Sequence, residues 1–212
     1  YIYIHDMSAR RDTMNCCLFD VAHVLSGGFE MGNIWYNEPK TLDVAFDVIG
    51  DIVLSAASQQ YGGFTVPSVD LILEPYAEKS YRRALAKYER LGVAADLAEK
   101  EALADVKKEF EQGFQGWEYK FNTVASSRGD YPFITVTAGT GTGQFARMAS
   151  VAMLEVRRGG QGKTGHKKPV LFPKIVFLYD EKKDGSKLKY VKWLPHVWNN
   201  DCLLYTSPSP RD

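Results

Sequence analysis

The fold is decided by residues 131–143, which read YPFITVTAGTGTG. The first part, residues 131–137, is rich in β-branched and aromatic residues and predicts a β-strand. The second part, residues 138–143, is a glycine-rich loop that leads into an expected helix over residues 144–158. A strand, a glycine-rich loop and a helix in this order form the start of a β–α unit, so the stretch favours a parallel sheet.

The rest of the chain extends this pattern on both sides. Apolar residues at spacings of three and four predict helices over residues 41–60, 67–89 and 94–124. Apolar runs predict strands over residues 14–19 and 170–179, the second of them buried on both faces because it is nearly all apolar. A turn at Asp184-Gly185 predicts a further hairpin strand over residues 187–193. The order strand, helices, strand, helix, strand predicts an α/β fold with parallel strands in one domain.

Composition excludes several classes of protein. The chain has 212 residues, 26 basic and 26 acidic side chains, and 45% hydrophobic residues, which is too apolar and too neutral for a disordered segment. Zero net charge favours neither a nucleic acid nor an anionic membrane as a partner, and no apolar run approaches the roughly 20 residues that span a bilayer. Three cysteines do not make a disulfide framework. We expect a cytoplasmic protein with no direct contact to membrane or nucleic acid.

Both ends of the chain predict that it is a piece of a longer protein. It opens at Tyr1-Ile2-Tyr3-Ile4, which has the alternation of a strand interior and no initiator methionine. Residues 202–212 read CLLYTSPSPRD and resemble the translation of a transposase adaptor used in sequencing libraries. We expect these eleven residues to be a read-through artefact, so that the partial domain spans residues 1–201.

The adjacent pair Cys16-Cys17 is the sharpest local feature. Neighbouring side chains on a strand point to opposite faces, so the pair cannot readily form a strain-free disulfide, and it offers too few ligands for a metal. Two interpretations remain open. Both cysteines are small buried residues, or one of them faces a cavity as a redox-active or hydrogen-donating thiol.

The histidines give weaker signals. His5-Asp6 has the residue types of a base and its orienting carboxylate, but adjacent side chains on a strand diverge, which favours a surface histidine. His23, His166 and His196 have no metal-ligand spacing, so no metal site is expected.

Three glycine-rich segments have both a structural and a functional interpretation. The loop Gly139–Gly143 at the start of a helix suits either phosphate binding by backbone N–H groups or close packing. Residues 159–164 (GGQGKT) fail the P-loop pattern because Arg157 stands where a glycine is required. Residues 59–63 (QQYGG) are either a plain helix end or a place where an amide, a phenol and bare backbone meet.

Taken together, the segments resemble one family, the anaerobic (class III) ribonucleoside-triphosphate reductases, which are glycyl-radical enzymes. The resemblance runs from residue 1 to about residue 180. It rests on the ordered segments Asn15-Cys16-Cys17-Leu18, Gly28–Asn33, Glu38-Pro39-Lys40, Gln60-Tyr61-Gly62-Gly63, Tyr76–Lys79, Asn122-Thr123, Ser126-Ser127, Pro132–Thr137, Gly139-Thr140-Gly141 and Phe172-Pro173-Lys174.

The resemblance implies a fold and a chemistry. The family fold is a ten-stranded α/β barrel, of which this chain would form part of the first half-barrel. A glycyl radical makes a thiyl radical on a finger-loop cysteine, which removes the ribose 3′ hydrogen. A second cysteine, on a barrel strand, gives hydrogen as the 2′ hydroxyl leaves as water. The resemblance assigns that second role to Cys16, as a buried and sterically fixed thiol, with Asn15 orienting the substrate and Cys17 facing the core.

The resemblance also implies binding residues and partners. We expect His5, Glu38 and Lys40 near a nucleotide effector, and the backbone-rich segments near the substrate, namely Tyr61, Gly62, Gly63, Gly139, Thr140 and Gly141. No cofactor is expected within this chain. The full-length enzyme would carry a glycyl radical, a structural zinc and ATP or deoxynucleotide effectors, would act as a homodimer on ribonucleoside triphosphates with formate or a dithiol as reductant, and would need a radical-SAM activase.

Two other functions remain open at this point. The chain could belong to a noncatalytic nucleotide-binding or regulatory module, or to another glycyl-radical enzyme, although the Asn15-Cys16-Cys17 motif disfavours the second. In each case the isolated chain is expected to be inactive.

Overall fold

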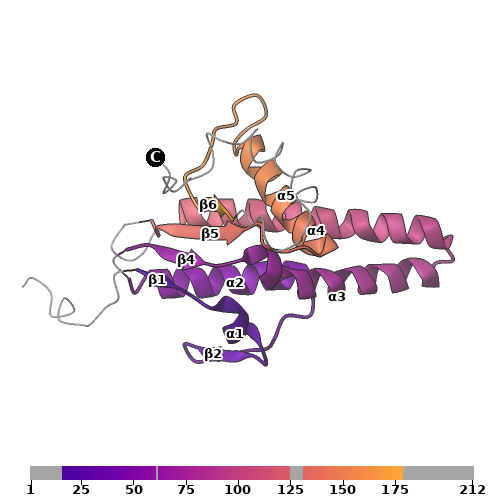
Figure 1. The fold of residues 1–212 in the computed structure, drawn as a ribbon, viewed down its shortest axis with the longest axis horizontal. Helices are drawn as coiled ribbons and strands as arrows, with labels where there is room; N and C mark the ends of the chain where they lie inside the picture. The colour runs from indigo at the N-terminus through magenta and orange to yellow at the C-terminus, as the bar shows by residue number, and fades with distance from the viewer. Residues whose placement is uncertain (1–15, 61, 125–130, 179–212) are drawn as a thin grey trace, which may run out of the picture.

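The computed structural model describes residues 16–60, 62–124 and 131–178 (Figure 1). Within these residues the main sheet has four strands, β1 (Cys17–Leu18), β4 (Phe64–Val66), β5 (Ile134–Ala138) and β6 (Lys174–Phe177). A separate hairpin is formed by β2 (Phe29–Met31) and β3 (Ile34–Tyr36). The helices are α1 (Val21–Leu25), α2 (Leu42–Ala57), α3 (Val69–Arg90), α4 (Ala95–Thr123) and α5 (Gln144–Gly159).

The four-stranded sheet is parallel, and its spatial order β1-β4-β5-β6 follows the order of the chain. Each strand is followed by helical chain before the next strand begins, as parallel strands require. The described strands show none of the order reversal that defines a doubly wound sheet. The α/β class with a parallel sheet is therefore confirmed.

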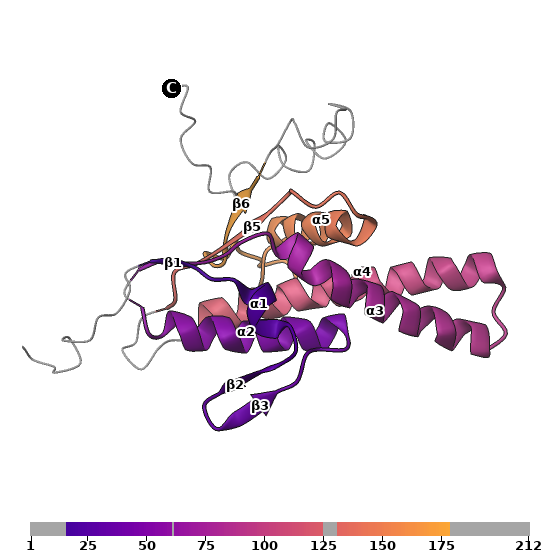
Figure 2. The ribbon, with the colours of Figure 1, turned by 60° about the horizontal axis from the view of Figure 1, so that its bottom comes forward.

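One face of the sheet packs on the helices. Phe64, Val66, Ile134, Val136 and Ile175 are all buried in one cluster with side chains of α2 to α5. Figure 2 shows the sheet lying along α2 and α4. The strands alternate between this buried face and a second face, where the side chains are half-buried or exposed.

Helices α3 and α4 form a long antiparallel hairpin that extends past the sheet (Figure 1). The chain reverses at Gly92, whose φ of +72° is a conformation that favours glycine. Gly113 and Gly116 lie inside one continuous helix, α4. At Gly113 the absent side chain makes room for the Phe46 ring of α2, which a Cβ would strike.

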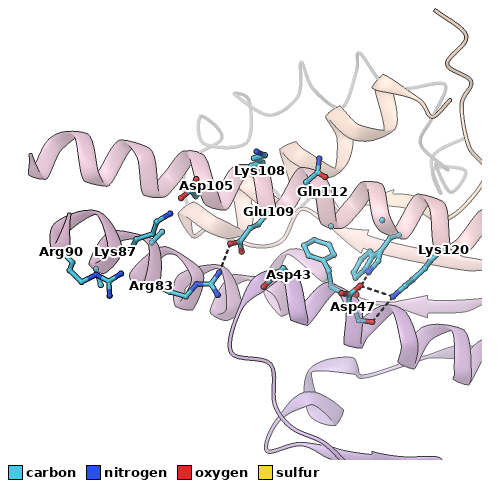
Figure 3. Close-up of a pocket in the computed structure, with 16 residues that line it drawn as sticks. Asp43, Asp47, Arg83, Lys87, Arg90, Asp105, Lys108, Glu109, Gln112 and Lys120 are labelled. Carbon is cyan, nitrogen blue, oxygen red and sulfur yellow. Dashed lines mark hydrogen bonds and ion pairs between the residues drawn. The ribbon is translucent and has the colours of Figure 1, made fainter. Parts of the chain in front are cut away.

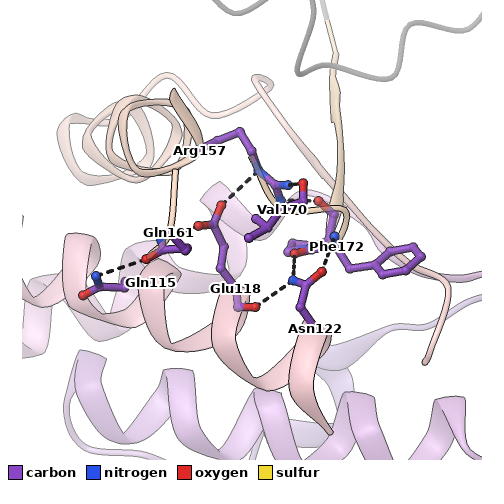
Figure 4. A network of polar contacts seen from close by, with 8 residues as sticks. Gln115, Glu118, Asn122, Arg157, Gln161, Val170 and Phe172 are labelled. Atoms are coloured by element: carbon purple, nitrogen blue, oxygen red, sulfur yellow. Dashed lines mark hydrogen bonds and ion pairs between the residues drawn. The ribbon is translucent and has the colours of Figure 1, made fainter. Parts of the chain in front are cut away.

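A buried polar network fixes β6 against α4 and α5 (Figure 4). The Nε of Arg157 lies 2.9 Å from Glu118 Oε1, and both side chains are almost fully buried. Arg157 also donates to the carbonyls of Val170, at 2.6 Å, and Pro173, just before β6. Asn122 pairs with the backbone of Phe172 through both its amide nitrogen, at 2.6 Å, and its oxygen, at 3.1 Å.

Two predicted strands are shorter than expected. Of the described residues 170–178, only Lys174–Phe177 form a strand; Lys174 is exposed, and Leu171 before it is 78% exposed. The prediction of a strand buried on both faces is therefore wrong. In the run 14–19, residues 14 and 15 lie outside the described residues, Cys17–Leu18 form a strand, and Leu18 is 76% exposed. The hairpin strand expected at 187–193 lies outside the described residues.

Four observed elements go beyond the sequence-based prediction. These are α1, both strands of the β2–β3 hairpin and β4. The three residues of β4 complete the sheet between β1 and β5, so the expected order lacked one strand. Within the described ranges, no helix combines the length and the apolar composition needed to cross a bilayer.

Candidate active site

The second face of the sheet, opposite the helices, carries a row of side chains that starts at Leu18, next to the cysteine pair. Leu18 is in register with Thr65, Thr65 with Thr135, and Thr135 with Lys174. Cys17 is in register with Phe64, which is buried under the helices, so Cys17 belongs to the helix-covered face. Cys16 lies one residue before β1, at a bend, and its sulfur accepts the Gly63 N–H.

The two thiols therefore have different surroundings. Cys17 is half-buried and packs against the hydrophobic core, as expected for the core-facing member of the pair. Cys16 is exposed. The interpretation that both cysteines are buried is wrong for Cys16, and the expectation of a buried reactive thiol is not met in the described residues. The thiol that the resemblance selects for chemistry is the exposed one.

One turn supplies a hydrogen-bond donor to each sulfur. The side-chain amide of Gln60 lies 2.9 Å from Cys17 Sγ, and the backbone N–H of Gly63 lies 3.3 Å from Cys16 Sγ. The backbone of Cys17 donates in return to the Gly63 carbonyl at 3.1 Å. The turn between α2 and β4 thus brings Gly63 to the cysteine pair. Tyr61, like Asn15, lies outside the described residues.

The other predicted substrate segment lies at the opposite end of the strands. Gly139, Thr140 and Gly141 follow the carboxyl end of β5 and lead into α5, as predicted. Cys17 shares its row with Ile134, the first residue of β5, so Gly139 lies about 16 Å further along the strand direction at roughly 3.3 Å per residue. The structure thus places Cys16 with Gly63 at one end of the sheet and the glycine loop at the other.

A buried carboxylate accepts hydrogen bonds from the glycine loop. The backbone N–H groups of Gly139 and Gly141 donate to Asp70 Oδ2 at 3.0 Å and 2.8 Å. Asp70 lies in the first turn of α3 and is 0% exposed. Ser68, the residue directly before α3, has a left-handed φ of +50° and donates its N–H to Thr137 Oγ1 at 2.8 Å.

Among the described residues, the predicted effector residue Glu38 bonds to neither the cysteine pair nor the glycine-rich loop. Glu38 forms an ion pair with Lys79 of α3 at 2.8 Å and accepts the N–H of Gly27 at 3.4 Å. The hydrogen bond from Lys79 holds the pKa of Glu38 below its ordinary value, with a smaller effect from the Gly27 N–H. Lys40 is exposed two residues further on. His5 lies outside the described residues.

A groove of about 990 Å³ lies within the helical layer between α2, α3 and α4 (Figure 3). Its floor is apolar, with Phe46 and Trp117, and its rim is crossed by the ion pair of Arg83 with Glu109, at 3.3 Å, and by that of Lys120 with Asp47, also at 3.3 Å. All of its lining residues come from these three helices, so the groove is distinct from the exposed face of the sheet.

Metal-binding chemistry has no support in the part of the chain that the structure describes. No group of three or more His, Cys, Asp or Glu side chains is placed there to hold a metal ion.

Two polar contacts of the site were not predicted from the sequence. They are the hydrogen bonds that Asp70 accepts and the hydrogen bond that Gln60 donates to the Cys17 sulfur. Asp70 is the second residue of α3, in a first turn where an acidic residue is ordinary, so only the long-range contacts to Gly139 and Gly141 distinguish it.

Known proteins resemble this chain in sequence and in fold. The sequence model of the family described as "Anaerobic ribonucleoside-triphosphate reductase" matches residues 1–199. A relative of that name from Enterobacteria phage T4 is 37% identical over 182 residues, which is 85% of this chain and 29% of the relative. A second, from Haemophilus influenzae, is 38% identical over 223 residues, which is 98% of this chain and 31% of the relative.

Solved structures agree on the fold. The anaerobic ribonucleotide reductase from Thermotoga maritima, with citrate in the active site, has a TM-score of 0.63 at 16% identity, over 98% of this chain and 38% of the other. The same enzyme in complex with dATP and CTP has a TM-score of 0.61. The chain spans about three tenths of the length of the curated relatives it matches. On the family match and these identities, the chain belongs to the anaerobic ribonucleoside-triphosphate reductase family.

Proposed function

We propose that a full-length protein carrying this chain reduces ribonucleoside triphosphates to 2′-deoxyribonucleoside triphosphates for DNA synthesis. The observation that carries the proposal is the different placement of the two cysteines in a chain that belongs to this family. Cys17 packs against the hydrophobic core and accepts the Gln60 amide, while Cys16 is exposed at the start of β1. A hydrogen-donating thiol must meet its substrate, and Cys16 is the thiol placed to do so.

Each residue of the site then has a role. Cys16 gives hydrogen from its thiol as the 2′ hydroxyl leaves as water, and Asn15 orients that hydroxyl. The Gly63 N–H at 3.3 Å fixes the position of the Cys16 sulfur, and the bare backbone of Gly62 and Gly63, with Tyr61 beside it, allows the ribose a close approach. These roles place the reacting end of the substrate at the start of β1.

The phosphates of the substrate are assigned to the other end of the sheet. The loop Gly139-Thr140-Gly141 lies about 16 Å from the cysteine row by strand rise, in the direction of the carboxyl ends of the parallel strands. The N-terminus of α5 follows the loop, and the N–H groups and dipole of a helix N-terminus favour anions. We assign the loop to the triphosphate on this basis.

The barrel, the regulation and the cofactors belong to the same proposal. The sequential strand order with helices on one face suits the first half of the family's ten-stranded barrel. A nucleotide effector would contact His5, Glu38 and Lys40 in a homodimer, and the T. maritima relative has been solved with dATP and CTP. The glycyl radical, which starts the reaction, and the structural zinc would come from other parts of the full-length protein, the radical through a radical-SAM activase.

The proposal is tested with the full-length protein after anaerobic activation, by following the conversion of labelled CTP to its 2′-deoxy product with formate or a dithiol protein as reductant. Product formation that depends on activation supports the proposal. CTP binding without conversion would make the protein a noncatalytic nucleotide-binding module. The absence of both binding and conversion would contradict the assignment of nucleotide chemistry to this chain.

A further inference from the structure

The glycine-rich loop is held from inside the protein by one carboxylate. Asp70 Oδ2 accepts both the Gly139 N–H, at 3.0 Å, and the Gly141 N–H, at 2.8 Å. The donor and acceptor residues are 69 and 71 positions apart in the sequence, so these bonds connect the start of α3 to the loop before α5. Because both amides are engaged by Asp70, they are not free donors for an outside anion.

The burial of the Asp70 carboxylate behind the loop is energetically unfavourable. The residue is 0% exposed, and its second oxygen, Oδ1, is buried and has no hydrogen-bond partner among the described residues. A buried carboxylate oxygen without a partner is unfavourable, and groups of this kind in native proteins call for an explanation in terms of function. The hydrogen bonds that Asp70 does form both go to the loop. Its position is explained by the loop.

The loop has an inward and an outward side. Gly139 and Gly141, whose amides meet Asp70, are buried, whereas Thr140 is half-buried and Thr142 is exposed. A side chain at Gly139 would strike the Leu178 carbonyl at 2.6 Å, and φ there is +115°. The glycines are thus required on the inward side. Thr140 Oγ1 lies 3.5 Å from Ser68 Oγ, whereas Thr142 stands on the side where a ligand has access.

We propose that Asp70 is a positioning residue that pre-organises the outward side of this loop for the triphosphate of the substrate. This inference rests on the proposed function, because it takes the loop as the triphosphate contact. A loop with three glycines in five residues has large backbone freedom, and a ligand that orders it loses affinity to that ordering. Asp70 removes the freedom beforehand, from the buried side, without touching the ligand.

The experiment measures equilibrium binding of CTP and of cytidine to the full-length, unactivated protein by calorimetry. In Asp70→Ala both loop bonds are lost, and we expect CTP to bind at least about tenfold more weakly. Cytidine, which has no phosphates, is expected to bind as it does to the wild type. In the same variant the amides of Gly139 and Gly141 are expected to exchange hydrogen faster.

Two further variants separate positioning from charge. Asp70→Asn loses the same charge as Asp70→Ala but keeps one carbonyl oxygen that accepts both amides, so CTP affinity is expected within about threefold of the wild type. Glu78→Gln, on the same helix, removes one charge from an exposed pair with Arg82 and is expected to change nothing. If Asp70→Ala does not fold, Asp70→Ser replaces it, since its hydroxyl is too short to reach both amides.

The outcomes are distinct. Equal or tighter CTP binding by Asp70→Ala would overturn the inference, because Asp70 would then only compete with phosphate. Equal weakening in Asp70→Ala and Asp70→Asn would also overturn it, because charge alone would be responsible. A wild-type protein that binds neither CTP nor cytidine would contradict the proposed function instead.

Discussion

The side-chain amide nitrogen of Gln60 lies 2.9 Å from Cys17 Sγ, so the turn after α2 holds the second cysteine of the pair on the helix side of the sheet. The first cysteine, Cys16, has the Gly63 N–H as its donor and remains exposed. Two neighbouring thiols of equal intrinsic chemistry are thereby given different access. The difference comes from the register of Cys17 with the buried Phe64, together with two donors from one turn.

This arrangement predicts different rates of thiol alkylation. In the full-length protein, iodoacetamide should modify Cys16 faster than Cys17, because Cys17 packs against the core and Cys16 does not. Gln60→Ala should raise the alkylation rate at Cys17 several-fold, because the Cys17 side chain loses the hydrogen bond that fixes its rotamer. Mass spectrometry of the peptide that carries both cysteines gives the two rates.

The matched control for that experiment is Gln59→Ala. Gln59 is exposed and its amide lies 3.5 Å from the Ser55 carbonyl, away from the cysteines, so both alkylation rates should stay at wild-type values. Equal rates at Cys16 and Cys17 in the wild type, or an equal effect of the two glutamine variants, would show that Gln60 does not distinguish the thiols.

The two glycines inside α4 predict stability changes of opposite sign. A Cβ at Gly113 would strike the Phe46 ring, so Gly113→Ala should lower the free energy of unfolding by about 1–3 kcal/mol through overpacking. A Cβ at Gly116 meets nothing within 4 Å, so Gly116→Ala should raise it by about 0.5–1 kcal/mol through the better helix propensity of alanine. Urea titrations of the full-length variants measure both. A loss of stability in Gly116→Ala would show that this position is more tightly packed than the structure has it.

The buried pair of Arg157 and Glu118 predicts a large single-variant effect. Arg157→Leu leaves the Glu118 carboxylate buried without its counter-charge and should cost about 3–5 kcal/mol of unfolding free energy. The double variant Arg157→Leu/Glu118→Leu should recover part of that loss, because no charge is then left unpaired. A double variant less stable than Arg157→Leu would mean that the backbone contacts of Arg157 to Val170 and Pro173 account for most of the effect.

The same pair predicts a pH dependence. Burial raises the pKa of Glu118 above its ordinary value, and the nearby Arg157 charge partly offsets this. A raised acid pKa means that the folded state holds the proton more tightly than the unfolded state, so stability falls as pH rises through that pKa. Removing Arg157 removes the offset. Arg157→Leu should therefore be less destabilised at pH 5 than at pH 8, and an equal loss at both values would contradict this.

The sequence predicted those parts of the fold that depend on local pattern. The helices now seen as α2 to α5 and the strand–loop–helix unit around Gly139 follow from apolar spacing and glycine placement. The β2–β3 hairpin could also have been predicted, since Gly32-Asn33 separates two short apolar runs. What could not be predicted is β4, because three residues after a glycine pair are too few to show a period.

The site could be predicted only in part, for a similar reason. The expected alternation of Cys16 and Cys17 is a local property of a strand, but which of the two faces the helices depends on the register of Cys17 with Phe64. The contacts of Gln60 with Cys17 and of Asp70 with Gly139 join residues 43 and 69 positions apart. Contacts at such separations depend on the assembled sheet, and no spacing rule contains them.

The central claim is that Cys16, and not Cys17, is the hydrogen-donating thiol of the pair. The most direct test compares Cys16→Ala with Cys17→Ala in the full-length protein after anaerobic activation, by measuring conversion of labelled CTP to its 2′-deoxy product, with CTP affinity as the control for folding. We expect that Cys16→Ala binds CTP but forms no deoxynucleotide, whereas Cys17→Ala keeps measurable turnover. An active Cys16→Ala variant beside an inactive, CTP-binding Cys17→Ala variant would contradict it.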